Sequence, residues 1–209
     1  AAIAEQKLTA ADPASDSEFM RRVYLDLTGT IPDSKTARAF IKDADAQKRT
    51  ELIDQLLASE SYATHMATVF DVMLMERRPD KYVTTSEWRT FLADSFRANK
   101  PLNALVAEIL GADGVDEKLQ PAAKFYLDRA VAKDVLVRDI GRLFLGVDLQ
   151  CAQCHDHPEI DDYLHQHYHG QSVFVAGSKT FKQPDGKFLL QEAVMREIEF
   201  ASVFEPDKT

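Results

Sequence analysis

The fold class is indicated most clearly by residues 59–78, which read SESYATHMATVFDVMLMERR. Apolar side chains recur there at intervals of three and four residues, as at Tyr62, Met66 and Phe70, and two arginines followed by Pro79 close the pattern. Such spacing places the apolar side chains on one face of an amphipathic helix. We expect this to be the longest helix of the chain.

Further helical patterns lie on both sides of this stretch. They cover residues 16–29, 33–41, 47–57, 85–96, 101–110 and 135–145. Downstream of Gly170 the apolar residues fit short strands or loops instead. The sequence therefore predicts a mainly α fold: one irregular multi-helix domain over residues 1–209, with an extended segment at 1–14 and an irregular or short-strand tail at 171–209.

Composition excludes several classes of protein. The chain has 209 residues, of which 45% are hydrophobic and 28% are charged, so disorder and fibrous repeats are excluded. Its formal net charge of −9 argues against nucleic acid as a partner and favours a partner with a basic docking surface. No run of eighteen apolar residues occurs, so we expect no membrane span.

The two cysteines of the chain carry its most specific chemical signal. They lie in the pentapeptide Cys151-Ala152-Gln153-Cys154-His155, which is the C-x-x-C-H pattern of covalent c-type haem attachment. In a tight helical turn, residues three apart share a face, so both sulfurs can meet the two vinyl groups of one porphyrin. The next residue brings an imidazole to the iron. The pattern predicts one covalent haem c, held by Cys151 and Cys154, with His155 as the proximal iron ligand.

Other readings of the same segment stay open. Five of the six histidines lie between His155 and His169, and two thiolates with two imidazoles also make a tetrahedral zinc site. Its ligands would be Cys151, Cys154, His157 and a later histidine. A redox dithiol and a structural disulfide are further alternatives.

The sixth iron ligand has three candidates. His169 and His165 lie four residues apart, far enough from the motif to fold across a porphyrin, and we favour His169 over His165. Met75, from the helix at 59–78, comes third. His157 is two residues from His155 and is followed by Pro158, so we expect it to form hydrogen bonds on the proximal side instead.

Two segments of the chain carry a family resemblance. Phe19–Gly29 with Pro32, and Arg138–Gly146 followed by Cys151–Pro158, resemble the planctomycete cytochrome-like family, whose members are exported and whose defining domain has no established activity. The resemblance extends to about Gly170, and it implies c-type haem binding and export. The chain departs from the family pattern at 165–169, where relatives usually carry an acidic residue and paired aromatic residues.

Taken together, the patterns predict an exported c-type cytochrome that acts in one-electron transfer, with an unidentified redox partner. Because 150 residues precede Cys151, the scaffold differs from the small cytochrome c fold, whose attachment site lies near the N-terminus. The start at Ala1 without a methionine fits a mature exported product, periplasmic or equivalent. Alternatives are a haem enzyme or gas-binding protein with an open sixth site, and a zinc-stabilised interaction domain.

Overall fold

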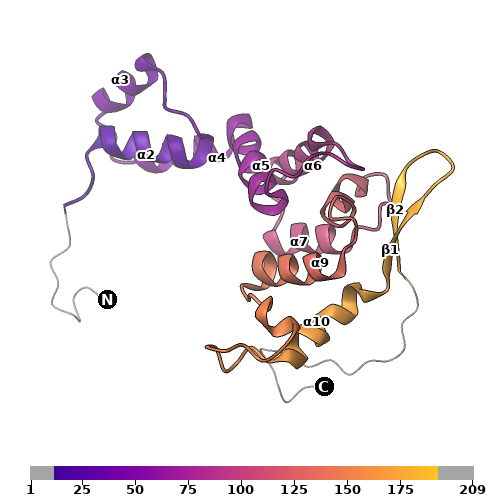
Figure 1. Ribbon diagram of the computed structural model, residues 1–209. Helices are drawn as coiled ribbons and strands as arrows, with labels where there is room; N and C mark the ends of the chain where they lie inside the picture. Colours follow the sequence, from indigo (N-terminus) through magenta and orange to yellow (C-terminus); the bar gives the residue numbers. More distant parts are fainter. Residues whose placement is uncertain (1–11, 193–209) are drawn as a thin grey trace. The chain divides into compact units, whose positions relative to one another are not determined.

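The structure is a computed structural model that describes residues 12–192, and it is mainly helical (Figure 1). Its contacts divide the chain into two compact units, one ending at Met66 and one beginning at Ala67. Helix α5, Glu60–Met75, contributes residues to both units. A division by contacts does not show whether the two units fold separately. The prediction of one domain over residues 1–209 therefore stays a prediction.

The first unit contains three further helices around a small apolar cluster. They are α2 (Asp16–Thr28), α3 (Ser34–Lys42) and α4 (Lys48–Leu57). Their buried side chains are Met20, Phe40, Leu52 and Leu56. Ser15 and Asp33 begin α2 and α3 as N-caps, because each side chain accepts hydrogen bonds from backbone N–H groups of the first helical turn.

A glycine ends α2 where the chain passes close to α5. Gly29 has φ +70°, a left-handed conformation that costs other residues free energy. A Cβ at this position would overlap the imidazole of His65, which lies on α5. Both the backbone angle and the space therefore require glycine here.

The second unit holds the main core. Its helices are α6 (Thr85–Arg97), α7 (Leu102–Leu110), the 3-10 helix η1 (Gln120–Ala123), α8 (Lys124–Leu127) and α9 (Lys133–Ile140). Trp88, Phe125, Leu127 and Leu136 are fully buried in one cluster. A capping box between Thr84 and Glu87 begins α6.

The C-terminal part of this unit is less regular. A π-helical turn η2 (Gly141–Leu145) continues α9, and the 3-10 helix η3 (Cys151–Gln153) and α10 (His165–Ala176) follow. Strands β1 (Ser178–Lys182) and β2 (Phe188–Glu192) form an antiparallel hairpin in which Thr180 faces Leu190. The backbone N–H of Leu190 donates to the carbonyl of Asp113, which ties the hairpin to the loop after α7.

The mainly α prediction with a less regular C-terminal segment is confirmed. Three details differ. The helix expected to reach residue 78 ends at Met75, because Glu76 and Arg77 adopt left-handed φ values of 51° and 58°. The helix expected at 135–145 changes from α to π at Gly141. Residues 171–176, expected in the irregular tail, belong to α10. Residues 1–11 of the segment expected to be extended, and residues 193–209 of the expected tail, lie outside the described part.

No helix within residues 12–192 combines the length and the apolar character that crossing a bilayer requires.

Candidate functional site

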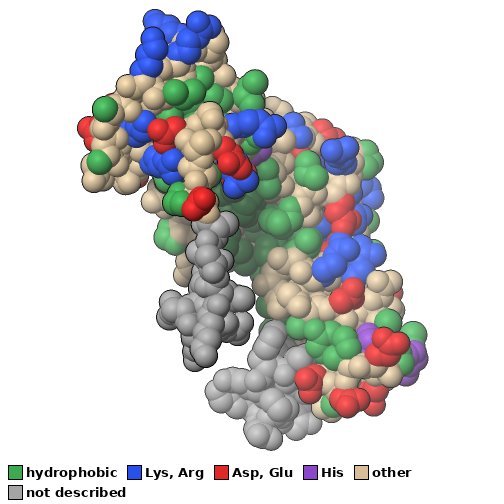
Figure 2. Space-filling model, turned by 90° about the vertical axis from the view of Figure 1, so that its left-hand side faces the viewer, with side chains coloured by type: hydrophobic (Ala, Val, Ile, Leu, Met, Phe, Trp, Pro, Cys, Tyr) green, Lys and Arg blue, Asp and Glu red, His purple; other side chains and the backbone are tan. Residues whose placement is uncertain are grey.

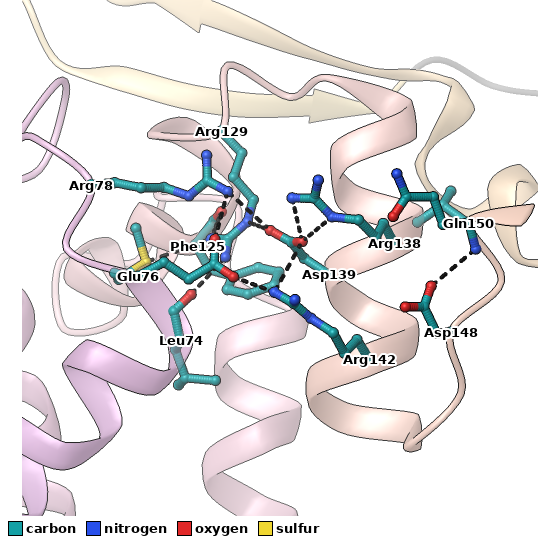
Figure 3. A network of polar contacts seen from close by, with 12 residues as sticks. Leu74, Glu76, Arg78, Phe125, Arg129, Arg138, Asp139, Arg142, Asp148 and Gln150 are labelled. Atoms are coloured by element: carbon teal, nitrogen blue, oxygen red, sulfur yellow. Dashed lines mark hydrogen bonds and ion pairs between the residues drawn. The ribbon is translucent and has the colours of Figure 1, made fainter.

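A buried ion pair fixes the helix that leads to the cysteines (Figure 3). The side chains of Arg129 and Asp139 are fully buried, and Nε of Arg129 donates to Oδ2 of Asp139 at 2.7 Å. The other nitrogens of Arg129 donate to the carbonyls of Phe125 and Leu74 at 2.9 Å and 2.6 Å. Burial alone would raise the pKa of Asp139, but the hydrogen bonds and charges of Arg129 and Arg138 outweigh it and lower that pKa. Asp139 therefore stays ionised and joins α9 to α8 and to the end of α5.

Three more arginines surround the same carboxylate (Figure 3). Arg138 donates from Nε to Oδ1 of Asp139 at 2.8 Å, and Arg78 donates to Oδ2 at 3.3 Å. Arg142, in the π-helical turn, pairs with Glu76, which Arg78 also contacts. Within the described residues, the ends of α5 and α9 are thus held together around two carboxylates.

The segment between η2 and η3 is held in place by side chains that are alternately buried and exposed. Val147 donates its N–H to the carbonyl of Gly141 at 3.0 Å, and a Cβ on Gly141 would press against the Val147 carbonyl. Val147 and Leu149 are buried, whereas Asp148 and Gln150 are exposed. A segment that buries alternate side chains has little freedom to slide, because a shift by one residue would bring Val147 and Leu149 to the surface. The position of the following turn is therefore set by packing.

Both cysteines lie on the surface of that turn. Ala152 is fully buried and anchors η3, while Cys151 and Cys154 are exposed on either side of it. The two thiols are free rather than joined in a disulfide. Two accessible sulfurs at this spacing can each react with an electrophile that approaches from solvent.

The hydrogen bond of His155 decides which of its nitrogens can bind a metal. Its Nδ1 lies 2.6 Å from the carbonyl oxygen of Asp156. A carbonyl only accepts, so Nδ1 carries the hydrogen and Nε2 keeps its lone pair. A ligating histidine is usually oriented by such a hydrogen bond from its other nitrogen to a carbonyl or carboxylate. His155 is exposed, so Nε2 is accessible to an incoming metal centre.

His157 has the opposite arrangement. Its Nδ1 accepts hydrogen bonds from the backbone N–H groups of Glu159 and Ile160, at 3.2 Å and 3.1 Å. In the neutral ring the hydrogen is therefore on Nε2, which is a donor and not a ligand. This favours the hydrogen-bonding role expected for His157 over a place in a zinc site. Across residues 12–192, no three side chains of His, Cys, Asp or Glu come together as ligands of one ion.

His167 was not singled out by the sequence analysis. It is 5% exposed, and its Nδ1 accepts from the backbone N–H of Leu164 at 3.1 Å, at the start of α10. Its Nε2 is buried without a hydrogen-bond partner among the described residues. The sequence has no signal that distinguishes this histidine from its neighbours, because burial in a His-rich stretch depends on tertiary packing.

The candidates for the sixth iron ligand lie in different surroundings. His165 and His169 are brought together on α10, where their Nε2 atoms are 2.9 Å apart. Met75 is 1% exposed in the core, and its sulfur lies 3.5 Å from Nη1 of Arg129. Of the three candidates, Met75 alone is enclosed by the core, whereas both histidines reach the surface. At the lower right of Figure 2, histidine side chains (purple) lie on the surface beside acidic side chains (red).

Tyr168 holds α10 against α9. It is 2% exposed, and its hydroxyl donates to Oδ1 of Asp134 at 2.8 Å. Burial, together with the hydrogen bond to Asp134 and the charge of its carboxylate, raises the pKa of Tyr168 well above its usual range. The phenol therefore stays protonated, and the tyrosine serves as a neutral anchor beside the cysteine turn.

A groove of about 670 Å³ lies elsewhere in the second unit. It is lined by residues of α6, of the loop that joins α6 to α7, of α7 and of the segment 116–121, including Phe91, Lys100 and Glu108. None of its lining residues comes from the segment 138–170. The groove is therefore separate from the cysteine and histidine segment.

One family comparison covers the whole of this segment. The model of the family PSCyt2, described as a protein of unknown function (DUF1549), matches residues 1–180. No curated protein and no solved structure matches the chain.

Proposed function

The chain belongs to the PSCyt2 family, proteins of unknown function (DUF1549), and from its site we propose that it is an exported c-type cytochrome with one covalently attached haem. Its task is one-electron transfer. Thioether bonds from Cys151 and Cys154 hold the haem, and Nε2 of His155 binds the iron on the proximal side. The resemblance of its motif segments to planctomycete cytochrome-like proteins supports the same assignment.

The observation that carries the proposal is the five-residue turn at Cys151. It combines two exposed free thiols with an exposed imidazole whose Nδ1 is bonded to the carbonyl of Asp156. Two nucleophilic sulfurs and one available imidazole nitrogen are the donor set that covalent haem attachment requires. The residues present therefore fit the group.

The protein's own residues have distinct tasks in this function. When bound, the haem supplies a one-electron couple between ferric and ferrous iron. Cys151 and Cys154 fix the macrocycle, and the Asp156 carbonyl fixes the orientation of the His155 ring. The ion network around Asp139 holds the approach to the turn in place.

The site is consistent with attachment outside the cytoplasm. Haem attachment needs reduced thiols that are presented to the cofactor in an exported state, and both thiols here are free and exposed. We therefore place the mature holoprotein in the periplasm or an equivalent compartment. Fractionation that found holoprotein only in the cytosol would contradict this part of the proposal.

The experiment is maturation of the full chain in an export-competent host that attaches haem to c-type cytochromes. The purified protein should keep its Soret band after acid–acetone extraction, because thioethers survive loss of the axial ligand. The Cys151→Ala/Cys154→Ala variant should lose covalent haem. His155→Ala should instead keep at least one thioether and change the spectrum of the iron.

Gln153→Ala is the matched control, because this residue lies between the two cysteines and supplies neither sulfur nor imidazole. It should retain covalent haem. Colourless protein with one bound zinc would instead support the zinc-stabilised alternative. A high-spin ferric spectrum in covalently loaded protein would support a haem enzyme or gas-binding protein with an open sixth site.

A further inference from the structure

The histidine pair on α10 has a geometry that the haem site does not use. His165 and His169 are four residues apart, so they share one face of the helix. Their ring centroids are 4.3 Å apart, and the Nε2 atoms approach to 2.9 Å. Two imidazole nitrogens at this separation either share one hydrogen or direct two lone pairs at a common ion.

The separation of the two nitrogens indicates a coordination geometry. Imidazole nitrogens lie about 2.0–2.1 Å from a divalent transition-metal ion, so two ligands at a right angle are about 2.9 Å apart. Two ligands at the tetrahedral angle would be about 3.3 Å apart. The observed 2.9 Å, which in the metal-free pair is also the length of a hydrogen bond, lies closer to the separation of neighbouring positions on a square-planar or octahedral ion. Cu²⁺ and Ni²⁺ adopt such geometries with nitrogen ligands, whereas Zn²⁺ prefers the tetrahedral one.

The pair is held by contacts that do not involve its ligating nitrogens. Oδ1 of Asp156 accepts from the backbone N–H of His165 at 2.7 Å, which brings a carboxylate to the same turn. Tyr168 and Gln171 fasten α10 to α9 through Asp134 and the carbonyl of Val137, at 2.8 Å and 3.0 Å. A ligand pair on a fixed helix loses little freedom on binding an ion.

The pair is accessible and lies in acidic surroundings. His169 is exposed and His165 is half-buried, so an ion can approach from solvent. The loop before α10 carries the exposed acidic residues Glu159, Asp161 and Asp162. Negative charge near a site raises the local concentration of cations. Water would complete the coordination, since the described residues bring no third side-chain ligand to the pair.

We propose that His165 and His169 form a two-imidazole binding site for a divalent transition-metal ion, with Cu²⁺ and Ni²⁺ preferred over Zn²⁺. This site is distinct from the haem and does not depend on its presence. Because Nε2 of His169 binds the ion, the same nitrogen is not the sixth ligand of the haem iron. The two uses of His169 can therefore be told apart by experiment.

The test is titration of the full chain, without an affinity tag, with CuCl₂ and NiCl₂. The Cys151→Ala/Cys154→Ala background removes the thiols, which would compete for the ions. We expect one strongly bound Cu²⁺ whose electron paramagnetic resonance spectrum shows splitting from two nitrogens. His165→Ala and His169→Ala should each weaken Cu²⁺ binding at least about tenfold, and Zn²⁺ should bind more weakly than Cu²⁺.

Gln166→Ala is the matched control, because Gln166 is exposed on the same helical turn. It should leave Cu²⁺ affinity unchanged. Unchanged affinity in both histidine variants, or splitting from a single nitrogen, would overturn the proposal.

The haem-loaded protein gives a second, independent readout. His165→Ala and His169→Ala should leave its ferric spectrum unchanged. A change from low-spin to high-spin iron in either variant would assign the pair to the haem and overturn the separate metal site. That result would leave covalent attachment intact, and loss of covalent attachment would leave the Cu²⁺ titration unaffected.

Discussion

The hydrogen-bond partner of one ring nitrogen determines what each histidine of the segment can do. Nδ1 of His155 meets a carbonyl, which leaves Nε2 free to bind a metal. Nδ1 of His157 and of His167 meets backbone N–H groups, which makes Nε2 a donor in both rings. Histidines that look equivalent in the sequence therefore divide into one proposed iron ligand, two donors and a facing pair.

Asp139 is the residue whose replacement should cost the most stability. Asp139→Asn would remove the negative charge facing Arg129, whose side chain is fully buried. Breaking a buried pair from one side typically costs about 3–5 kcal/mol, because the remaining charge is uncompensated. Urea unfolding followed by circular dichroism measures the change in the free energy of unfolding.

An exposed ion pair provides the control for Asp139. Glu18 pairs with Arg22 on the surface of α2, where both side chains are largely exposed. Glu18→Gln should lower the free energy of unfolding by at most about 1 kcal/mol. Equal losses in the two variants would contradict the role assigned to Asp139.

Asp80 should make stability depend on pH in the acid range. Hydrogen bonds from the side chain and backbone of Thr85, with the nearby Lys124, lower the pKa of Asp80 to about 2. A carboxyl whose pKa is lowered by folding stabilises the protein above its ordinary pKa of 3.8, and this stabilisation is lost as the pH falls towards 2. The difference in free energy of unfolding between wild type and Asp80→Asn should therefore be largest above pH 5, fall through pH 2 and disappear only below it.

A second substitution checks the cause of this pH dependence. Thr85→Val removes the side-chain hydroxyl that donates to Asp80. The loss of stability that it causes should become smaller as the pH falls through the same range. An effect of Asp80→Asn that stayed constant from pH 7 to pH 2 would count against this account.

Residue types at fixed spacing could be read from the sequence, but their hydrogen bonds could not. The pentapeptide at Cys151 predicts that both thiols and His155 hold a haem, because covalent attachment requires those residues at that spacing. His165 and His169 come together because both lie on α10. The start of this helix has no Ser, Thr, Asp or Asn cap that would predict it from the sequence. The burial of His167 depends on packing between distant segments. Neither feature has a local sequence signal.

At the scale of secondary-structure elements, the helices that bury one apolar stripe were the ones predicted well. Helix α6, for example, is expected at 85–96 and spans Thr85–Arg97. Its N-terminal cap, its apolar stripe and the basic residue in its last turn all indicate the same helix. The end of α5 was placed too late, since Glu76 and Arg77 leave the helical backbone with left-handed φ values, and Glu76 forms ion pairs with Arg78 and Arg142 beyond the helix. Long-range ion pairs of this kind leave no periodic trace in a sequence.

The junction between α2 and α5 should be sensitive to one methyl group. Gly29→Ala would impose the left-handed backbone on alanine, at about 1–2 kcal/mol, and would also overlap the ring of His65. We expect a loss of stability larger than the backbone cost alone. The Gly29→Ala/His65→Ala double variant should recover the part that comes from the overlap, measured by thermal or urea unfolding.

Gly146 offers a matched control for this junction. Its φ of +69° is nearly that of Gly29, and nothing lies within 4 Å of the position of its Cβ. Gly146→Ala should therefore show the backbone cost without the overlap. Equal losses for the two glycine variants would show that the His65 ring moves aside at no cost.

At the scale of the whole molecule, the charge of the chain should control its reactions with small redox agents. The net charge of −9 attracts cations and repels anions over a Debye length that decreases from about 30 Å at 0.01 M salt to about 8 Å at 0.15 M. For haem-loaded protein, reaction with a cationic cobalt complex should slow as salt rises. Reaction with anionic ferricyanide should accelerate.

Stopped-flow absorbance at the Soret band measures both rates. The opposite signs of the two salt dependences serve as the internal control, because viscosity or specific ion effects would act on both reactions alike. Rates that did not change with ionic strength would remove the electrostatic argument for a basic docking surface on the redox partner.

The π-helical turn at Gly141–Leu145 has a consequence for how related chains are compared. A π turn holds one residue more than an α turn of the same span, so it records a place where the chain can be one residue longer without losing its helix. A relative with an ordinary α-helix here would align only through a single-residue gap between 141 and 145. Without that gap, every later position would be offset by one, and Cys151 and His155 would be matched to the wrong residues.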